Sequence, residues 1–100
     1  MVKHIVQFQL SRDLSVEERQ HIAQTFKEGI EALPAVIPTI RHIYVGVNIN
    51  PAESWDICLE SSFDSLDDVR AYGVHPAHQA VAGTLKPHAT GRSCVDFEVG

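Results

Sequence analysis

Residues 2–10 read VKHIVQFQL, and their side chains alternate between two faces of an extended chain. Successive side chains of a β-strand point to opposite faces, so this period of two predicts a strand with one strongly apolar face. His4 would lie on that apolar face, whose members are Val2, His4, Val6, Phe8 and Leu10.

A long amphipathic helix is predicted next. Ser15 and Glu18 have the spacing of a capping box, in which each side chain bonds the other's backbone N–H. The helix is expected to run to about Leu33, because Pro34 lacks the N–H that a helix interior needs. Its apolar stripe recurs every three or four residues, at Ile22, Phe26, Ile30 and Leu33.

Three further strands are predicted, over residues 39–49, 56–63 and 92–99. Between the last two lie signals for two short helices. Ser65 caps the first of them, and Pro76 suits the first turn of the second. The inward faces are expected to be Leu66, Val69 and Tyr72 in the first helix, and His78, Val81 and Leu85 in the second.

The resulting order, β-α-β-β-α-β over residues 1–100, predicts one α+β domain with the ferredoxin-like arrangement. In that arrangement an antiparallel four-stranded sheet carries its helices on one side. The other face would hold Ile5 and Cys58 and is not plainly polar. A second copy of the chain is therefore expected to cover it, giving a homodimer through the open sheet face.

Composition excludes several classes of protein. Eight basic residues against thirteen acidic ones, with a net charge of −5, argue against nucleic-acid binding. No apolar run is long enough to span a bilayer, and no signal peptide is apparent. Cys58 and Cys94 lack metal-site spacing and are expected to be reduced and half-buried in a cytoplasmic protein. No glycine-rich phosphate loop or ligand cluster is present, so no cofactor is implied.

The stretch YGVHPAH, residues 72–78, concentrates groups that can handle protons. Tyr72, His78 and His4 are each predicted to point between helices and sheet, and such convergence in an apolar layer is typical of a small-ligand pocket. His78 lies in the first turn of its helix, where the dipole favours neutral imidazole. It could take an acidic proton between two carbonyls while Tyr72 hydrogen-bonds the enolate. Tyr72 and His78 are thus the catalytic candidates, and His4 and His75 the substrate-binding ones.

Two other interpretations remain open. In the first, Tyr72 and His78 only pack in the core, and His75 only caps a helix. In the second, His75 and His78, three residues apart, hold a metal ion together with His4.

The chain also resembles a known family in several segments: Lys3-His4-Ile5-Val6, Ile37-Pro38, Val45-Gly46, Phe63-Asp64-Ser65, Tyr72, His75-Pro76-Ala77-His78, Leu85-Lys86-Pro87 and Val95-Asp96-Phe97. These look like the Dabb family of stress-responsive, dimeric α/β-barrel proteins.

The resemblance implies a protomer of the fold predicted above, two of which pack their sheets into a barrel. A plant polyketide cyclase of that family has its acting tyrosine and histidine at positions matching Tyr72 and His78, and a pocket histidine matching His4. A further pocket histidine is replaced here by Ile57. The implied function is a small-molecule pocket, with cyclase or isomerase activity on a carbonyl compound; the alternative is a non-enzymatic, stable, stress-related oligomer.

Overall fold

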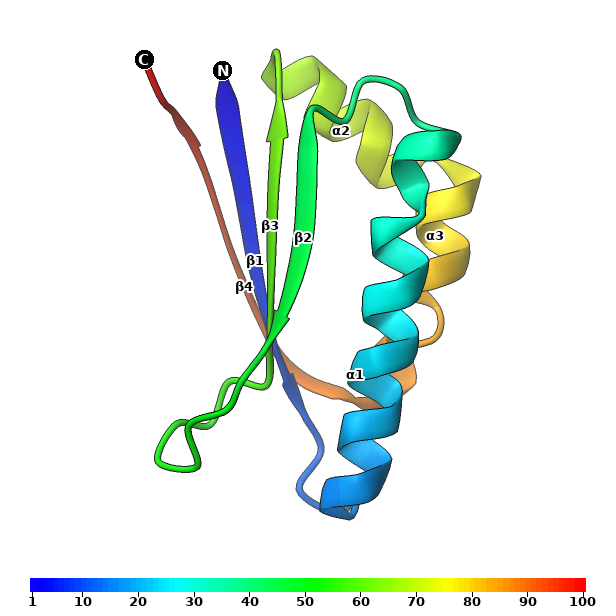
Figure 1. Cartoon of the computed structure of the whole chain (residues 1–100), viewed down its shortest axis with the longest axis vertical. Coiled ribbons are helices and arrows are strands. Elements are labelled where there is room, and N and C mark those ends of the chain that lie inside the picture. The colour runs from blue at the N-terminus through cyan, green and yellow to red at the C-terminus, as the bar shows by residue number, and fades with distance from the viewer.

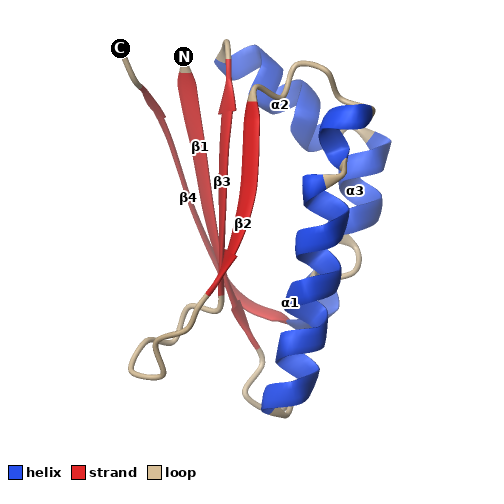
Figure 2. Cartoon of the chain, in the orientation of Figure 1, coloured by secondary structure: helices blue, strands red, loops and turns tan.

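Four antiparallel strands form one sheet, in the order β2-β3-β1-β4, in the computed structural model, which describes residues 1–100. The strands are β1 (Val2–Leu10), β2 (His42–Val47), β3 (Ile57–Phe63) and β4 (Ala89–Glu98). Three helices lie together on one side of the sheet: α1 (Val16–Glu31), α2 (Leu66–Val74) and α3 (Pro76–Ala82) (Figure 1). The layers are clear in Figure 2, and the predicted ferredoxin-like protomer is confirmed.

Strand β1 lies inside the sheet and sets which residues face the helices. His4 lies opposite Ser61 of β3 on one side and Asp96 of β4 on the other. Directly paired residues of an antiparallel ladder point to the same face. The inner face of β4 therefore carries Arg92, Cys94 and Asp96, as the predicted alternation of β1 places His4 there.

Helix α1 begins with the predicted capping box. The Ser15 hydroxyl accepts from the Glu18 N–H at 3.1 Å, and the Glu18 carboxylate accepts from the Ser15 N–H at 2.8 Å. The expected stripe is buried at Phe26, Ile30 and Leu33. The helix itself ends at Glu31, and a 3-10 helix (Leu33–Ala35) follows. The predicted end at Leu33 was thus two residues late, although Leu33 keeps its place in the core.

Other boundaries also differ from prediction. Strand β2 begins at His42 rather than at residue 39, and β4 begins at Ala89 rather than at residue 92. Helix α2 continues to Val74 and ends where Pro76 disfavours a helical conformation of His75.

Two side chains were assigned to the wrong surroundings. Leu66 was expected to point inward but is 40% exposed. It is the first residue of α2, and helical side chains lean toward the N-terminus, past the covered layer. Cys94 is exposed, whereas half-burial was expected. Cys58 lies on the open face and Cys94 on the helix face, so both thiols are free.

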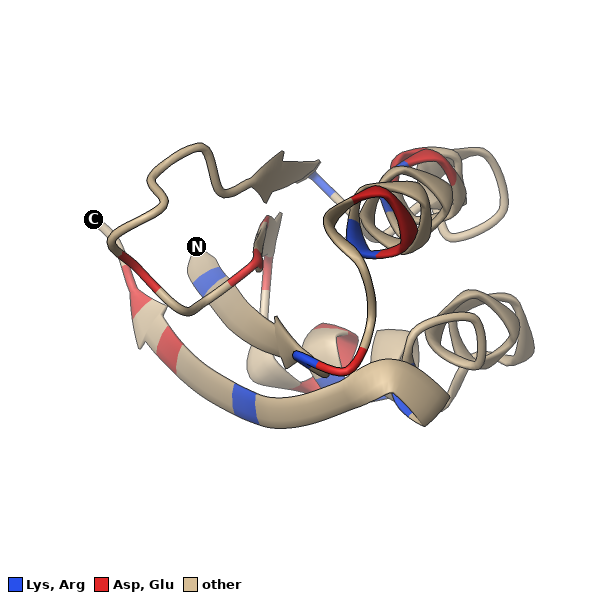
Figure 3. Ribbon diagram, turned by 90° about the horizontal axis from the view of Figure 1, so that it is seen from below, with Lys and Arg blue, Asp and Glu red and all other residues tan.

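The sheet face away from the helices is partly apolar. Val95 and Phe97 are 53% and 45% exposed there, beside the half-buried Ile5. Lys3 and Glu60 form an ion pair of 2.6 Å on the same face. Charged residues are otherwise scattered along the chain rather than gathered on one element (Figure 3). No helix is both long and apolar enough to cross a membrane.

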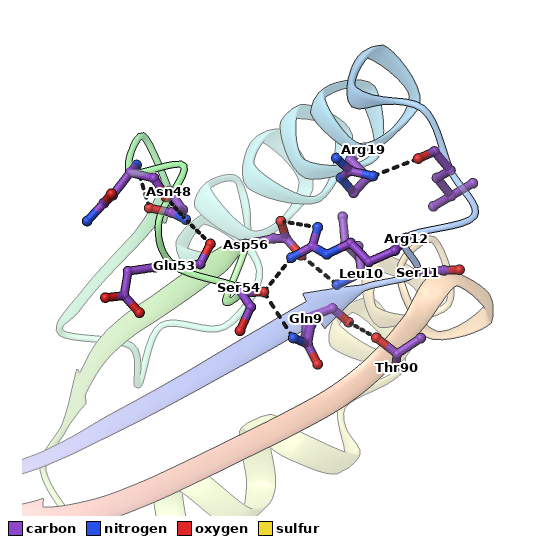
Figure 4. A network of polar contacts seen from close by, with 12 residues as sticks. Gln9, Leu10, Ser11, Arg12, Arg19, Asn48, Glu53, Ser54, Asp56 and Thr90 are labelled. Carbon is purple, nitrogen blue, oxygen red and sulfur yellow. Dashed lines mark hydrogen bonds and ion pairs between the residues drawn. The ribbon is translucent and has the colours of Figure 1, made fainter.

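A polar network fastens the far end of β1 to the β2–β3 connection (Figure 4). The Asp56 carboxylate accepts from the Leu10 N–H at 2.7 Å and from the Arg12 guanidinium at 3.1 Å. Arg12 and Gln9 also donate to the Ser54 carbonyl, at 2.6 and 3.2 Å. The network holds this end of the molecule together and places β1 in register for the opposite end.

Candidate functional site

A cavity of about 330 Å³ lies between the inner face of the sheet and the α2–α3 region. Most of its wall is apolar: Val6, Phe8, Phe26, Leu59, Val69 and Leu85. His4, Tyr72 and His78 also line it. The structure therefore brings together the three side chains that the sequence predicted to converge.

Tyr72 is the most enclosed of the three, with 1% of its surface exposed. Its ring centroid lies 4.3 Å from that of His78, 6.1 Å from that of His4 and 5.1 Å from that of Phe63. Its hydroxyl is buried and has no hydrogen-bond partner within the chain. Burial raises the pKa of Tyr72 well above its ordinary value, so the hydroxyl keeps its proton and remains a donor.

His78 projects from α3 and is held by its own local backbone. Its Nδ1 lies 3.1 Å from the Gly73 carbonyl oxygen. A carbonyl can only accept, so Nδ1 donates and Nε2 of the neutral ring keeps a free lone pair. Burial lowers the pKa of His78, and the charges of Lys86 and Arg92 lower it further. The predicted neutral imidazole is thus favoured, chiefly by burial and not by the helix dipole.

His4 is oriented by an acidic partner that the sequence analysis missed. Its Nδ1 lies 2.5 Å from the Asp96 carboxylate, which comes from the paired position on β4. A carboxylate that accepts from Nδ1–H fixes the tautomer and leaves Nε2 as the free nitrogen. The Asp96 signal is visible only once β4 is paired with β1, because the two residues are far apart in sequence.

The other residues singled out earlier lie elsewhere. His75 caps α3, accepting from the Ala77 N–H through Nδ1 at 3.0 Å, and does not line the cavity. Ile57, which the resemblance matched to a pocket histidine, is 2% exposed in the core and also lies outside the cavity wall.

One group of side chains has metal-ligating chemistry. His4, Cys94 and Asp96 each bring a donor atom, and these atoms lie within 4.8 Å of one another. Nitrogen, sulfur and carboxylate oxygen are donors that Zn²⁺ accepts. This is not the set considered in the alternative metal interpretation of the sequence, because His75 and His78 do not join His4 in a ligand cluster. In the arrangement seen, His4 Nδ1 is occupied by its hydrogen bond to Asp96.

The fold and the cavity together define a ferredoxin-like α+β protomer that encloses a ligand-sized space between sheet and helices. The chain belongs to the Dabb family, the stress responsive A/B barrel domain, whose model matches residues 2–99.

Several proteins are similar to this chain over most of its length. A dimeric, ferredoxin-like protein of unknown function from Bacteroides fragilis superposes with a TM-score of 0.96 at 52% identity, over 98% of this chain and 95% of that one. An uncharacterized protein of Streptomyces coelicolor is 30% identical, covering 90% of this chain and 92% of its own length. Olivetolic acid cyclase of Cannabis sativa is 24% identical, over 77% and 75% of the two chains.

Proposed function

We propose that the cavity binds a small carbonyl compound and that Tyr72 and His78 catalyse proton transfer at the carbon next to its carbonyl. The resulting chemistry is that of an isomerase or a cyclase. The buried Tyr72 hydroxyl without a partner carries the proposal, because buried polar groups in folded proteins are nearly always hydrogen-bonded. A ligand carbonyl in the cavity would supply the missing acceptor.

The proposed reaction assigns one role to each side chain. Nε2 of the neutral His78 takes the proton from a carbon next to the carbonyl, such as the carbon between the two carbonyls of a diketone. The C–H electron pair moves into the adjacent carbonyl, and the resulting enolate oxygen accepts a hydrogen bond from the Tyr72 hydroxyl. In a substrate whose enolate is conjugated with a carbon–carbon double bond, return of the proton from the His78 imidazolium to the far carbon of that conjugated system shifts the double bond and isomerises the substrate. Attack of the enolate carbon on a second carbonyl of the same molecule forms a carbon–carbon bond and closes a ring, and the resulting alkoxide oxygen takes the proton from the His78 imidazolium.

His4 serves as a substrate-binding group in this proposal. Asp96 holds its Nδ1, which leaves Nε2 to meet a second polar atom of the ligand. His75 is proposed to act only indirectly, by capping the helix that carries His78. The relationship to olivetolic acid cyclase supports ring closure as one outcome.

The functional unit is proposed to be a homodimer through the open sheet face. The dimeric relative from Bacteroides fragilis and the exposed Val95 and Phe97 support this assembly. The proposed setting is the cytoplasm, where free thiols such as those of Cys58 and Cys94 stay reduced. Light scattering at micromolar concentration tests the dimer, and a single species of 11.1 kDa would refute it.

Benzoylacetone and phenylacetone test the site, the first for binding and the second for exchange of its methylene hydrogens in deuterated water. We expect the parent to bind benzoylacetone and to accelerate exchange above the buffer rate. His78→Gln should abolish the acceleration. Tyr72→Phe should weaken binding about tenfold, since one well-placed hydrogen bond is worth roughly 1.4 kcal/mol.

Two matched controls separate site chemistry from general effects. His21→Gln removes an exposed imidazole of α1, and Tyr44→Phe removes an exposed hydroxyl. Both should behave as the parent does. Absence of binding and exchange in the parent would refute the proposal and favour a non-enzymatic, stress-related oligomer. So would equal losses in the site variants and the controls.

A further inference from the structure

The basic side chains divide into those that are paired and those that are not. Five of the eight form ion pairs with carboxylates: Lys3, Arg12, Lys27, Arg41 and Arg70. Arg19 donates to the Leu14 carbonyl at 2.6 Å. Only Lys86 and Arg92 remain without a carboxylate or carbonyl partner. The chain has thirteen acidic residues, so carboxylates are not scarce. The two cations lack an ion pair because no carboxylate lies beside them.

Both unpaired cations line the cavity that holds Tyr72 and His78. They come from different elements: Lys86 begins a 3-10 helix (Lys86–His88), and Arg92 lies on β4. No aspartate or glutamate lines the same cavity. The positive charges therefore face a space that contains no negative group of the chain.

The strand register gives the position of the cations along the cavity. Arg92 is paired with Phe8, and Asp96 is paired with His4, on the same face of the sheet. Four residues separate these two rungs, which corresponds to roughly 13 Å along a strand. The Asp96 charge is engaged by His4 at one end, and Arg92 stands at the other. Both cations are near enough to His78 to lower its pKa.

We infer that the ligand of this cavity carries an anionic group, a carboxylate or a phosphate, that binds Lys86 and Arg92 while its carbonyl portion lies against Tyr72 and His78. This inference rests on the proposed function for the carbonyl portion. Arginine offers a planar pair of donors that matches either oxyanion, and lysine adds a compact charge. The two cations thus fix the orientation in which an elongated substrate binds in the cavity.

Two probes with the same skeleton test the inference. Benzoylpyruvate differs from benzoylacetone only in that a carboxylate replaces the terminal methyl group. We expect the parent protein to bind benzoylpyruvate at least about tenfold more tightly, the equivalent of one charge-assisted contact. In the double variant Lys86→Gln/Arg92→Gln this preference should disappear, while benzoylacetone binding changes less than about twofold.

Arg70→Gln is the matched control, because it removes a positive charge that is already ion-paired on α2 and lies outside the cavity wall. It should keep the preference for benzoylpyruvate. Phenyl phosphate serves as a third probe: displacement of benzoylpyruvate at lower concentration than benzoate requires assigns the site to phosphates, and the reverse assigns it to carboxylates.

The outcomes separate the two proposals. If both diketones bind equally to the parent, or if the double variant keeps the preference, the anionic ligand is refuted and the carbonyl site stands. If neither diketone binds, the carbonyl site fails and the inference fails with it. Circular dichroism of the double variant confirms that it is folded, as both substitutions replace exposed side chains.

Discussion

The two hollows beside β1 differ in how their polar side chains are paired. At the end near Leu10, Asp56 and Arg12 find partners within the chain, even though an open groove of about 700 Å³ lies beside them. In the smaller cavity between the sheet and helices α2 and α3, the Tyr72 hydroxyl has no partner and Lys86 meets no carboxylate. Polar groups that stabilise the fold have hydrogen-bond or ion-pair partners within the free protein. Polar groups proposed to bind a ligand lack such partners until the ligand is present. Pairing, rather than the size of the hollow, distinguishes the two regions.

The largest effect on stability is expected from Asp56→Ala. The change leaves the buried Leu10 N–H without an acceptor and deprives Arg12 of its carboxylate. Loss of a buried hydrogen-bond acceptor costs about 2 kcal/mol of unfolding free energy. Urea unfolding measures the loss, and benzoylacetone binding should be unaffected.

Asp56→Asn is the control for that experiment, because its amide oxygen still accepts from Leu10 while the charge is gone. It should lose less than half as much stability as Asp56→Ala. If Asp56→Ala were as stable as the parent, the network would make no measurable contribution to the free energy of unfolding.

Gly29→Ala should also destabilise the protein, against the general rule for helices. Alanine in place of a mid-helix glycine usually adds about 0.5–1 kcal/mol of stability. Here the new Cβ would lie 2.8 Å from Val81 Cγ1, and a β-branched side chain cannot turn away easily. We expect a net loss of about 1 kcal/mol from overpacking between α1 and α3.

Val81→Ala in the same chain removes the clash and tests this cause. The double variant should be more stable than Val81→Ala alone. If Gly29→Ala were stabilising by itself, α3 could shift away from α1 to accept the new methyl group. The position of His78 on α3 would then not be fixed by the packing of these two helices.

His78 should make stability depend on pH. Its folded pKa is lowered from the ordinary 6.5, so the unfolded chain binds a proton more readily. The contribution to stability is therefore complete above pH 6.5 and is lost as the pH falls toward the lowered value. Thermal unfolding across this range should show a smaller decline in His78→Gln than in the parent. Identical declines would show that His78 titrates as an exposed residue does.

The smallest effect on stability is expected from Tyr72→Phe. The substitution keeps the ring contacts with His78 and Phe63 and deletes a hydroxyl that bonds to nothing. Removing an unpaired buried hydroxyl is nearly neutral or slightly stabilising, within about 0.5 kcal/mol. A loss of more than about 1 kcal/mol of unfolding free energy in urea would show that the hydroxyl has a hydrogen-bond partner inside the protein. Tyr72 would then not differ from Asp56 in this respect.

Local patterns predicted most of the fold. The alternation of residues 2–10 was enough to place His4 on the inner face, and the capping signals of Ser15 and Ser65 began their helices as expected. Tyr72 could be assigned inward because it shares a helical face with the buried Val69, and His78 because it shares one with Val81, which packs against the core. Their meeting with His4 then followed from the layer arrangement alone.

Long-range pairing was the part that local patterns could not supply. Asp96 and Arg92 matter because β4 lies beside β1, and nothing in residues 92–99 indicates which rung each one joins. That Lys86 has no carboxylate partner can be seen only in the structure, because it depends on the positions of all the acidic side chains. Sequence therefore indicated the imidazoles and the phenol, but not their partner or the cations.

Strand β4 lies at the edge of the sheet, with Val95 and Phe97 on one side and Arg92 and Asp96 on the other. In a homodimer, one face of this strand is held by the second copy and the other by the cavity ligand. The two binding events then share one element, and thermodynamic reciprocity applies: by whatever factor the ligand tightens the dimer, dimerisation tightens the ligand. If the ligand tightens the dimer, measured ligand affinity would rise with protein concentration, and a cell could then adjust occupancy of the cavity through the amount of protein it makes.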